Sequence, residues 1–365
     1  MTNKLLYMLL LFCSIGVIAQ DKLRIKGKIE GIPNEATLSL SYDKQEIEFK
    51  AVDGVFEVET QIIKAPTSVY LFIKNGEDFK YTSFFLGNES VTIEGNVNNL
   101  KYLQAEGSAY DGLRYESELL TKDVRIARDV IESKISKLVE EGMSQDSVMA
   151  SYKEEYLRME QNIKDLDYEF LKKNINTDYG RYILGFIIND DNTNHHKELY
   201  NLVDNQYLNT DAVVFLKTLL DKEPLVKGDK YYDFIALDLN QKESKFSDNF
   251  KGKYVLLDFS SPYCWFCRQA VPITTKITEA LEDKLVHVTY CIDNDLVSAK
   301  QYKDLKGDKG VIVWDKKGMM SSTIAKYRMR GTPYYVLFNL EGRVLKIFDQ
   351  GLEDDFEEQL RALMK

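Results

Sequence analysis

The feature that most constrains the fold of this chain is the spacing of its apolar residues, which changes twice along the sequence. In the first segment apolar and polar residues alternate with period two, as in "LRIKGKIEG" and "TSVYLFIK". In the second they recur every three or four positions, as in amphipathic helices. In the third the run "GKYVLLDFS", typical of a strand buried on both faces, precedes helical spacing. We therefore predict a β-rich domain, a helical region and an α/β domain, at residues 20–108, 109–226 and 231–365.

The period-two segment predicts an antiparallel sandwich or an open barrel. Asp53 and Gly54 stand between two alternating runs, and this pair is a strong signal for a tight hairpin because glycine tolerates positive φ. No catalytic constellation occurs in this segment. We interpret it as a binding or docking module.

The helical segment contains two apolar stripes, at residues 124–138 and 148–170, separated by "EEGMSQDS". This pattern predicts an antiparallel helix hairpin. The stripes could form a dimer seam, but packing within the chain is the more common outcome. Two shorter helices are expected at residues 179–188 and 210–220.

The amino terminus has the layout of a cleaved secretory signal peptide over residues 1–19. Lys4 precedes a short apolar run from Leu5 to Phe12, and Ala19 is placed for cleavage. Lipid attachment at Cys13 is the less favoured alternative, because the bulky Phe12 departs from the usual pattern. We therefore expect export to the periplasm.

Charge and cysteine content narrow the possible functions. The 365 residues carry a net charge of −10, which argues against nucleic acid or an anionic membrane surface as the main partner. Removal of the signal peptide would leave Cys264, Cys267 and Cys291. Three cysteines are too few to form a stabilising disulfide framework in a chain of this length. A disulfide in this protein is therefore expected to be redox-active and not structural.

Cys264 and Cys267 lie in "SSPYCWFCRQAVP", directly after the buried strand and at the start of helical spacing. Cys264 is thus predicted at a helix N-terminus, where unpaired N–H groups and the helix dipole stabilise a thiolate. Cys267 falls in the first helical turn and should be more shielded. An exposed attacking thiol and a buried resolving thiol are what thiol–disulfide exchange requires.

The segments "LLDFSSPYCWFCRQAVP" and "RMRGTPYYVLFNLEGRV" resemble the thioredoxin fold. The form is that of periplasmic thiol–disulfide oxidoreductases of the ResA/TlpA type, which overlap with AhpC/TSA-like sequences. The preceding segments are similar to the DUF4369-like extension of many Bacteroidetes members. The resemblance implies an α/β thioredoxin fold at the C-terminus, preceded by an antiparallel β domain and a helical connector.

The resemblance also implies roles for individual residues. Cys264 corresponds to the nucleophile and Cys267 to the resolving cysteine. Pro333 matches the cis-proline beside the disulfide, which would expose the backbone of Thr332 for pairing with an extended substrate. Asp258 matches the buried acid, whose carboxyl should have a raised pKa and take the proton of the resolving thiol.

The chain departs from the family pattern around the cysteines. Tyr263 and Phe266 replace the usual tryptophan and proline, and Ala270 replaces a glutamate common in ResA-type proteins. The missing glutamate weakens the expectation of a narrow specificity in cytochrome c maturation. Tyr263 and Trp265 are expected to contact the substrate, Trp265 as an apolar surface for extended polypeptide. Pro272 matches the family's helix-kinking proline.

Other chemistries are less favoured. A zinc site would need His287 and Cys291 beside the cysteine pair; we expect His287 to be an ordinary strand residue and Cys291 a core residue. Peroxidase chemistry would use Ser261 but lacks an upstream proline. The adjacent His195 and His196 are expected in a solvated loop.

The favoured function is thus an exported reductase of disulfide-containing proteins, kept reduced by a membrane thiol electron donor. No cofactor or metal is expected, and the oligomeric state stays open. The alternative is a periplasmic binding or scaffold protein whose thioredoxin-like domain is inert.

Overall fold

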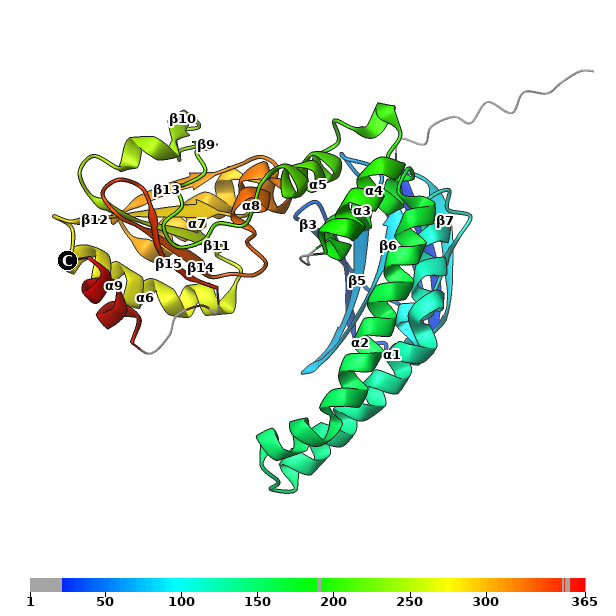
Figure 1. The fold of residues 1–365 in the computed structure, drawn as a ribbon. Helices are drawn as coiled ribbons and strands as arrows, with labels where there is room; N and C mark the ends of the chain where they lie inside the picture. Colours follow the sequence, from blue (N-terminus) through cyan, green and yellow to red (C-terminus); the bar gives the residue numbers. More distant parts are fainter. Residues whose placement is uncertain (1–21, 189–191, 350, 352–354, 365) are drawn as a thin grey trace, which may run out of the picture. The chain divides into compact units, whose positions relative to one another are not determined.

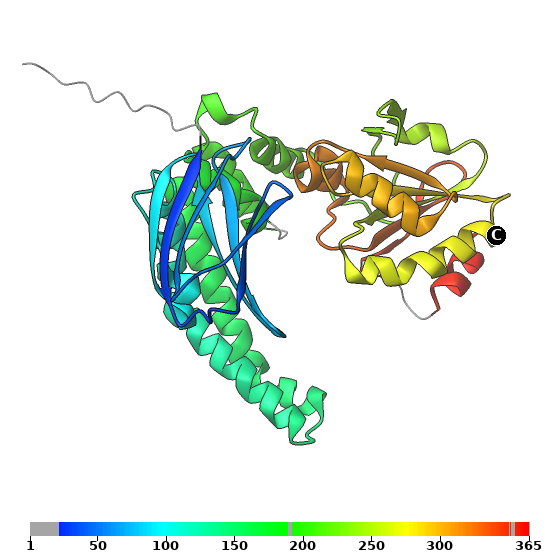
Figure 2. The ribbon, with the colours of Figure 1, turned by 180° about the vertical axis from the view of Figure 1, so that it is seen from behind.

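The computed structural model describes residues 22–188, 192–349, 351 and 355–364, so the predicted signal peptide and Cys13 lie outside the described residues. The chain divides into two compact units, Met1–Phe170 and Leu171–Lys365. The elements of each unit are shown in Figure 1, and Figure 2 shows them from behind.

The first unit contains two four-stranded sheets, with strand orders β4-β1-β7-β8 and β3-β2-β5-β6. Their pairs are antiparallel except for β1 with β7, which is parallel. An alternating pattern predicts a half-buried strand but does not indicate the direction of its neighbour. The strands are β1 (Leu23–Glu30), β2 (Thr37–Tyr42), β3 (Gln45–Phe49), β4 (Val55–Thr60), β5 (Thr67–Asn75), β6 (Asp78–Leu86), β7 (Ser90–Asn96) and β8 (Ala105–Glu106).

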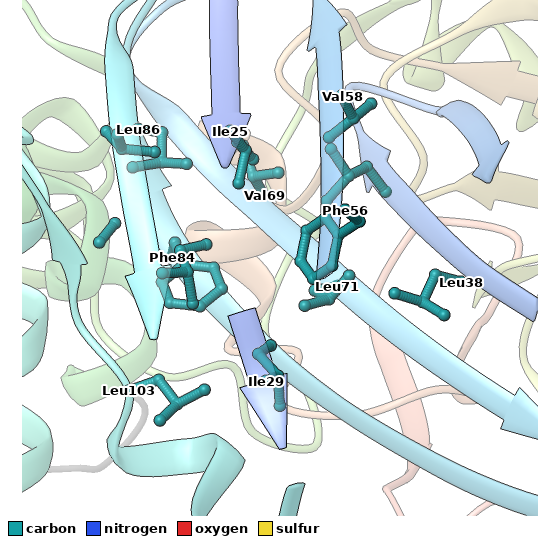
Figure 3. Close-up of a cluster of buried hydrophobic side chains, with 14 of the residues drawn as sticks. Ile25, Ile29, Leu38, Phe56, Val58, Val69, Leu71, Phe84, Leu86 and Leu103 are labelled. Carbon is teal, nitrogen blue, oxygen red and sulfur yellow. The ribbon is translucent and has the colours of Figure 1, made fainter. Parts of the chain in front are cut away.

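One apolar core holds the two sheets together. Buried and exposed residues alternate strictly along β1, and its buried side chains join those of the other sheet in a single cluster. Figure 3 shows Ile25 and Val58 from one sheet beside Val69, Leu71 and Phe84 from the other. The unit is therefore a β-sandwich, one of the two architectures predicted.

The hairpin predicted at Asp53 and Gly54 is wrong in one respect. Both residues have positive φ, 51° and 76°, and an isolated bridge between Val52 and Val55 closes the turn. However, β3 pairs with β2 and β4 pairs with β1, so the turn leads from one sheet to the other. Asp53 and Gly54 therefore form the tight turn that was predicted. Which strands pair on either side of that turn is decided by packing in the apolar core, which these two residues do not indicate.

Two long helices, α1 (Asp111–Glu140) and α2 (Gln145–Asn174), form the predicted antiparallel hairpin. Arg128 of α1 bonds Glu160 of α2 at 2.9 Å. The buried Asp111 carboxylate fixes the start of α1 to the sandwich by accepting N–H bonds from Phe85 and Ala105. Because α2 continues beyond Phe170, the helical region predicted at 109–226 is divided between the two units.

The second unit begins with short helices. The predictions at 179–188 and 210–220 correspond to α3 (Asp178–Ile187) and α5 (Asp211–Asp221). The predicted loop around His195 and His196 is wrong, because both residues lie on α4 (Thr193–Leu202) and His196 is buried. The Asn192 side chain caps this helix by accepting the N–H of His195, which lets a polar segment start a helix.

A seven-stranded mixed sheet forms the centre of the second unit, with strand order β10-β9-β13-β12-β11-β14-β15. β11, β12 and β13 are parallel to one another, and β14 lies antiparallel to β11. The strands are β9 (Ile235–Leu237), β10 (Glu243–Lys245), β11 (Tyr254–Ser260), β12 (Leu285–Cys291), β13 (Val311–Trp314), β14 (Tyr334–Phe338) and β15 (Val344–Phe348).

Apolar side chains cover both faces of this sheet, as the uninterrupted apolar run in β11 predicts. Alternate residues of β11 point to opposite sides, so Val255 and Leu257 belong to one cluster and Leu256 to another. The helices are α6 (Trp265–Ala280), α7 (Leu296–Lys306), α8 (Ser322–Tyr327) and α9 (Phe356–Leu363). Within the described residues, the structure has no helix with the length and apolar character needed to span a membrane.

Candidate active site

The cysteine pair lies where β11 turns into α6. Cys264 is the N-cap of α6, and its sulfur accepts the N–H of Cys267 at 3.2 Å. The turn is closed by the N–H of Cys264, which donates to the carbonyl of Ser261 at 3.2 Å. The predicted position of Cys264 at a helix N-terminus is confirmed, and one N–H of the first turn, that of Cys267, donates to its sulfur.

Cys267 is fully buried in the first turn of α6. Burial, followed by the hydrogen bond with Cys264, raises the pKa of the Cys267 thiol to about 12. Its apolar neighbours include Tyr302, Trp314 and Cys291, the last of which is a core residue as predicted. The two thiols therefore differ in accessibility, as exchange chemistry requires.

The second segment of the site is the loop before β14. The Thr332–Pro333 peptide bond is cis, as predicted, and the Cys264 thiol donates to the Thr332 carbonyl at 3.4 Å. Residues far apart in sequence thus meet at one sulfur atom.

Three exposed aromatic side chains flank Cys264 in the sequence. Tyr263, Trp265 and Phe266 are 58%, 57% and 67% exposed, and the rings of Trp265 and Phe266 meet edge to face at 5.0 Å. Beside them is a groove of about 520 Å³. It is lined by Phe266, Gln269, Ala270, Ile273, Gly331, Thr332, Pro333, Asp349 and Gly351. This surface is largely apolar, and Ala270 contributes a methyl group where a glutamate would place a charge.

Asp258 lies on β11 and is fully buried, but the prediction that its pKa is raised is wrong. Burial alone would raise the pKa of this carboxyl. The contact with His287, the charge of Lys306 and the hydrogen bond from Ser260 together outweigh burial, so the pKa is lowered. Asp258 is therefore a carboxylate at neutral pH.

His287 and Lys306 are the residues that sequence reasoning missed. Asp258 is paired with Thr289 in the β11–β12 register, so His287, two residues earlier on β12, projects to the same face. The alternation of side chains along the strand could therefore have predicted that His287 lies beside Asp258. Lys306, at the end of α7 and only 2% exposed, offered none, because helix-terminal lysines are usually solvated.

His287 is not placed for a metal. Its Nε2 lies 3.1 Å from Asp258 Oδ2 and its Nδ1 lies 3.1 Å from Thr278 Oγ1. Burial and the nearby charge of Lys306 lower the pKa of His287 to about 4, so the ring is neutral at pH 7. Among the residues with described coordinates, no three His, Cys, Asp or Glu side chains are grouped to hold a metal ion.

Comparison with known families agrees with this geometry. Residues 226–362 match the Redoxin family, and residues 23–111 match a domain of unknown function, DUF4369. The chain therefore joins a DUF4369 domain to a redoxin domain. The thioredoxin-like fold predicted for the carboxy-terminal part is thus confirmed.

The redoxin domain is similar to curated thiol–disulfide oxidoreductases named ResA. It is 25% identical to that of Halalkalibacterium halodurans over 139 residues, covering 38% of this chain and 77% of the relative. It is also 25% identical to that of Bacillus thuringiensis, covering 40% of this chain and 80% of the relative. A solved thioredoxin domain of a Bacteroides vulgatus thiol–disulfide oxidoreductase is 24% identical, with 39% of this chain and 99% of that chain covered and a TM-score of 0.35. The redoxin domain is thus similar to thiol–disulfide oxidoreductases over most of their length.

Proposed function

We propose that this protein is a thiol–disulfide oxidoreductase that reduces disulfides in other proteins through Cys264 and Cys267. The observation that supports the proposal most strongly is the position of the Cys264 sulfur, which has three relevant neighbours. Cys264 caps α6, its thiol bonds the carbonyl that precedes Pro333, and the buried Cys267 lies one turn along the helix. An attacking thiol, a resolving thiol and a backbone site for the substrate are thereby combined.

The reaction balances without a cofactor. The Cys264 thiolate attacks one sulfur of the substrate disulfide, forming a mixed disulfide and releasing the other sulfur as a thiolate that takes up a proton. Cys267 then attacks the Cys264 sulfur and forms the Cys264–Cys267 disulfide. The second substrate thiol leaves, and two electrons have passed to the substrate.

Asp258 is proposed to accept the Cys267 proton transiently, before the leaving substrate sulfur takes it. Its lowered pKa has two opposing consequences. Asp258 is ionised at neutral pH and can accept a proton there, but it is a weaker base than a carboxyl with a raised pKa would be. The buried Tyr302 lies near both groups, since the charges of Asp258 and of Cys267 each act on its phenol.

The substrate class follows from the exposed surface. Trp265 and Tyr263 would lie against an extended polypeptide whose backbone pairs with Thr332. Neither Trp265 nor Phe266 is polar, so no side chain between the cysteines adds to thiolate stabilisation. We therefore propose a moderately reducing couple, kept reduced by a membrane thiol donor.

Trapping of the mixed disulfide tests the proposal. Cys267→Ala should accumulate a disulfide between Cys264 and a reduced-and-reoxidised test protein, because the resolving step is removed. Cys264→Ala should trap nothing, and Cys291→Ala, which removes the third thiol, should turn over like the wild type. If Cys267→Ala traps no more than Cys264→Ala, the inert binding or scaffold function replaces this one.

Export is part of the same proposal and rests on the apolar segment Leu5–Phe12. Sequencing the amino terminus of the protein recovered from the periplasm tests it. A mature chain starting after Ala19 is expected. A chain that begins at a lipidated Cys13, or that stays in the cytoplasm with residues 1–19 intact, would contradict it.

A further inference from the structure

β6 is an outer strand of its sheet, with β5 as its one neighbouring strand among the residues that the structure describes. Its first half, residues 78–81, is exposed, whereas Phe84, Phe85 and Leu86 at its end are buried. An exposed outer strand presents unpaired backbone N–H and C=O groups, to which a further strand can bond. The first half of β6 is therefore available for pairing with another polypeptide.

A hydrogen bond of Phe85 shows which backbone groups of β6 point away from β5. The Phe85 N–H donates to Asp111 Oδ1 at 3.0 Å, so it points away from β5. In an antiparallel pair the backbone groups of alternate residues point to the same side, and the register of β5 with β6 has no shift. The N–H and C=O groups of Phe79, Tyr81 and Ser83 therefore point outward as well. These groups form an open edge, which Asp111 closes at Phe85.

Aromatic rings lie beside this open edge. Phe79 and Tyr81 are 58% and 60% exposed, and Phe72 of β5 contacts both, with ring centroids 5.4 and 6.0 Å away. The three rings lie on the face of the sheet turned away from the apolar core, because the core receives the alternate residues Leu71 and Ile73 of β5. A strand added to β6 would therefore place every second side chain against this aromatic cluster.

The charge along the open edge is positive. Within residues 79–83 of β6, Lys80 is the only charged residue, while the acidic Glu77 and Asp78 lie at the turn before them. Lys74 lies on the neighbouring β5, and both lysines are exposed. A segment with an acidic residue opposite Lys80 would gain a cross-strand ion pair, whereas a second copy of this chain would bring another Lys80 to the same edge. Charge therefore favours an acidic segment of another protein over self-association.

We propose that the open edge of β6 binds an extended segment of a protein substrate as an added strand. Alternate apolar side chains of this segment would face the aromatic cluster, with acidic or neutral side chains between them. The inference rests on the proposed function for the identity of the bound polypeptide as a disulfide-containing substrate. A segment held at β6 stays attached to the chain that contains Cys264, and this raises the local concentration of its disulfide.

A binding test separates this role from redox chemistry. The probe is fluorescently labelled, reduced and carboxymethylated α-lactalbumin, an acidic polypeptide that stays unfolded and has neither a disulfide nor a free thiol. Its binding to the full chain would be measured by fluorescence anisotropy. Tyr81→Ala removes one ring and keeps the outward N–H, whereas Tyr81→Pro removes both. Proline is tolerated at such outward positions of an outer strand, so Tyr81→Pro should keep its pairing with β5, which a circular dichroism melting curve checks.

Tyr81→Ala should weaken binding about two- to tenfold through the lost aromatic contact. Tyr81→Pro should weaken it by about a further two- to tenfold, the equivalent of one backbone hydrogen bond. Lys80→Glu should weaken binding of this acidic probe about two- to fivefold. Lys64→Glu, which reverses an exposed charge elsewhere in the first unit, is the matched control and should bind like the wild type. Cys264→Ala should also bind like the wild type, because the probe offers no sulfur to attack.

A wild-type chain that does not bind the probe, or equal binding by Tyr81→Ala and Tyr81→Pro, would overturn the inference. So would a wild-type dimer in sedimentation that Tyr81→Pro converts to a monomer, since the edge would then bind a second copy. If Tyr81→Pro does not fold, equal binding by Lys80→Glu and Lys64→Glu would overturn it instead.

Kinetics test the link to the proposed function. Tyr81→Pro should raise KM for a protein disulfide and leave the reduction of small disulfides unchanged, and an unchanged KM would overturn the role in substrate binding. If binding depends on Tyr81 in a chain that reduces no protein disulfide, the edge is confirmed as a polypeptide site and the proposed function alone fails.

Discussion

Replacing His287 by glutamine should make the redoxin domain less sensitive to acid. The wild-type imidazole is buried and neutral. As the pH falls, it either takes up a proton in the protein interior or takes one up from water after the domain unfolds. Glutamine can still donate to Asp258 through its amide, but it takes up no proton in this range. The substitution therefore removes the titration while keeping the hydrogen bond.

The size of the effect follows from the pKa difference. The folded pKa of His287 is lowered to about 4, whereas an unfolded histidine titrates near 6.5. The unfolded chain binds the proton first, so stability falls as the pH drops from about 6.5 to about 4. A difference of about 2.5 units corresponds to about 3 kcal/mol, a large part of the 5–15 kcal/mol that typically stabilises a domain.

Urea titrations followed by tryptophan fluorescence measure this domain selectively. The two tryptophans of the chain, Trp265 and Trp314, both lie in the second unit. The wild type should lose about 3 kcal/mol more than His287→Gln between pH 6.5 and 4. Thr278→Val, which removes the partner of Nδ1 but keeps the imidazole, should retain the acid sensitivity. Parallel stability curves for wild type and His287→Gln would refute the reasoning.

Three further outcomes are expected. Trp265→Ala should slow reduction of protein disulfides more than that of small disulfides, and equal slowing would count against a polypeptide-binding role. Arg114→Met leaves the buried Asp111 carboxylate without its ion-pair partner and should cost about 3 kcal/mol or more, seen as a lower melting temperature by circular dichroism; an unchanged melting temperature would show the pair to be dispensable. Tyr290→Phe removes a 2.8 Å bond to Ser321 and should cost about 1 kcal/mol in urea titrations, whereas a gain in stability would contradict that estimate.

The sequence predicted those features that depend on local pattern. The period-two and helical segments located the sandwich strands and the hairpin of α1 and α2. The apolar run before Cys264 located the central strand of the redoxin domain. The cysteine spacing placed Cys264 at a helix start and Cys267 inside it, because a strand–turn–helix sequence leaves little choice of geometry.

Features that depend on contacts between distant elements were not predictable. The turn at Asp53 and Gly54 was visible, but the change of sheet that it makes was not, because the choice of partner strand belongs to the whole core. The pKa of Asp258 was predicted in the wrong direction for a similar reason. Burial could be inferred from β11 alone, whereas the compensating Lys306 reaches the site from a helix more than forty residues away in sequence.

The central claim is that Cys264 and Cys267 form a reversible redox couple, and its reduction potential tests this most directly. The purified protein would be equilibrated with glutathione buffers and its unreacted thiols counted. We predict a two-electron transition with a potential near or below that of thioredoxin, about −270 mV. A potential of about −120 to −180 mV would contradict the reductase direction, and two thiols that never pair would contradict the account as a whole.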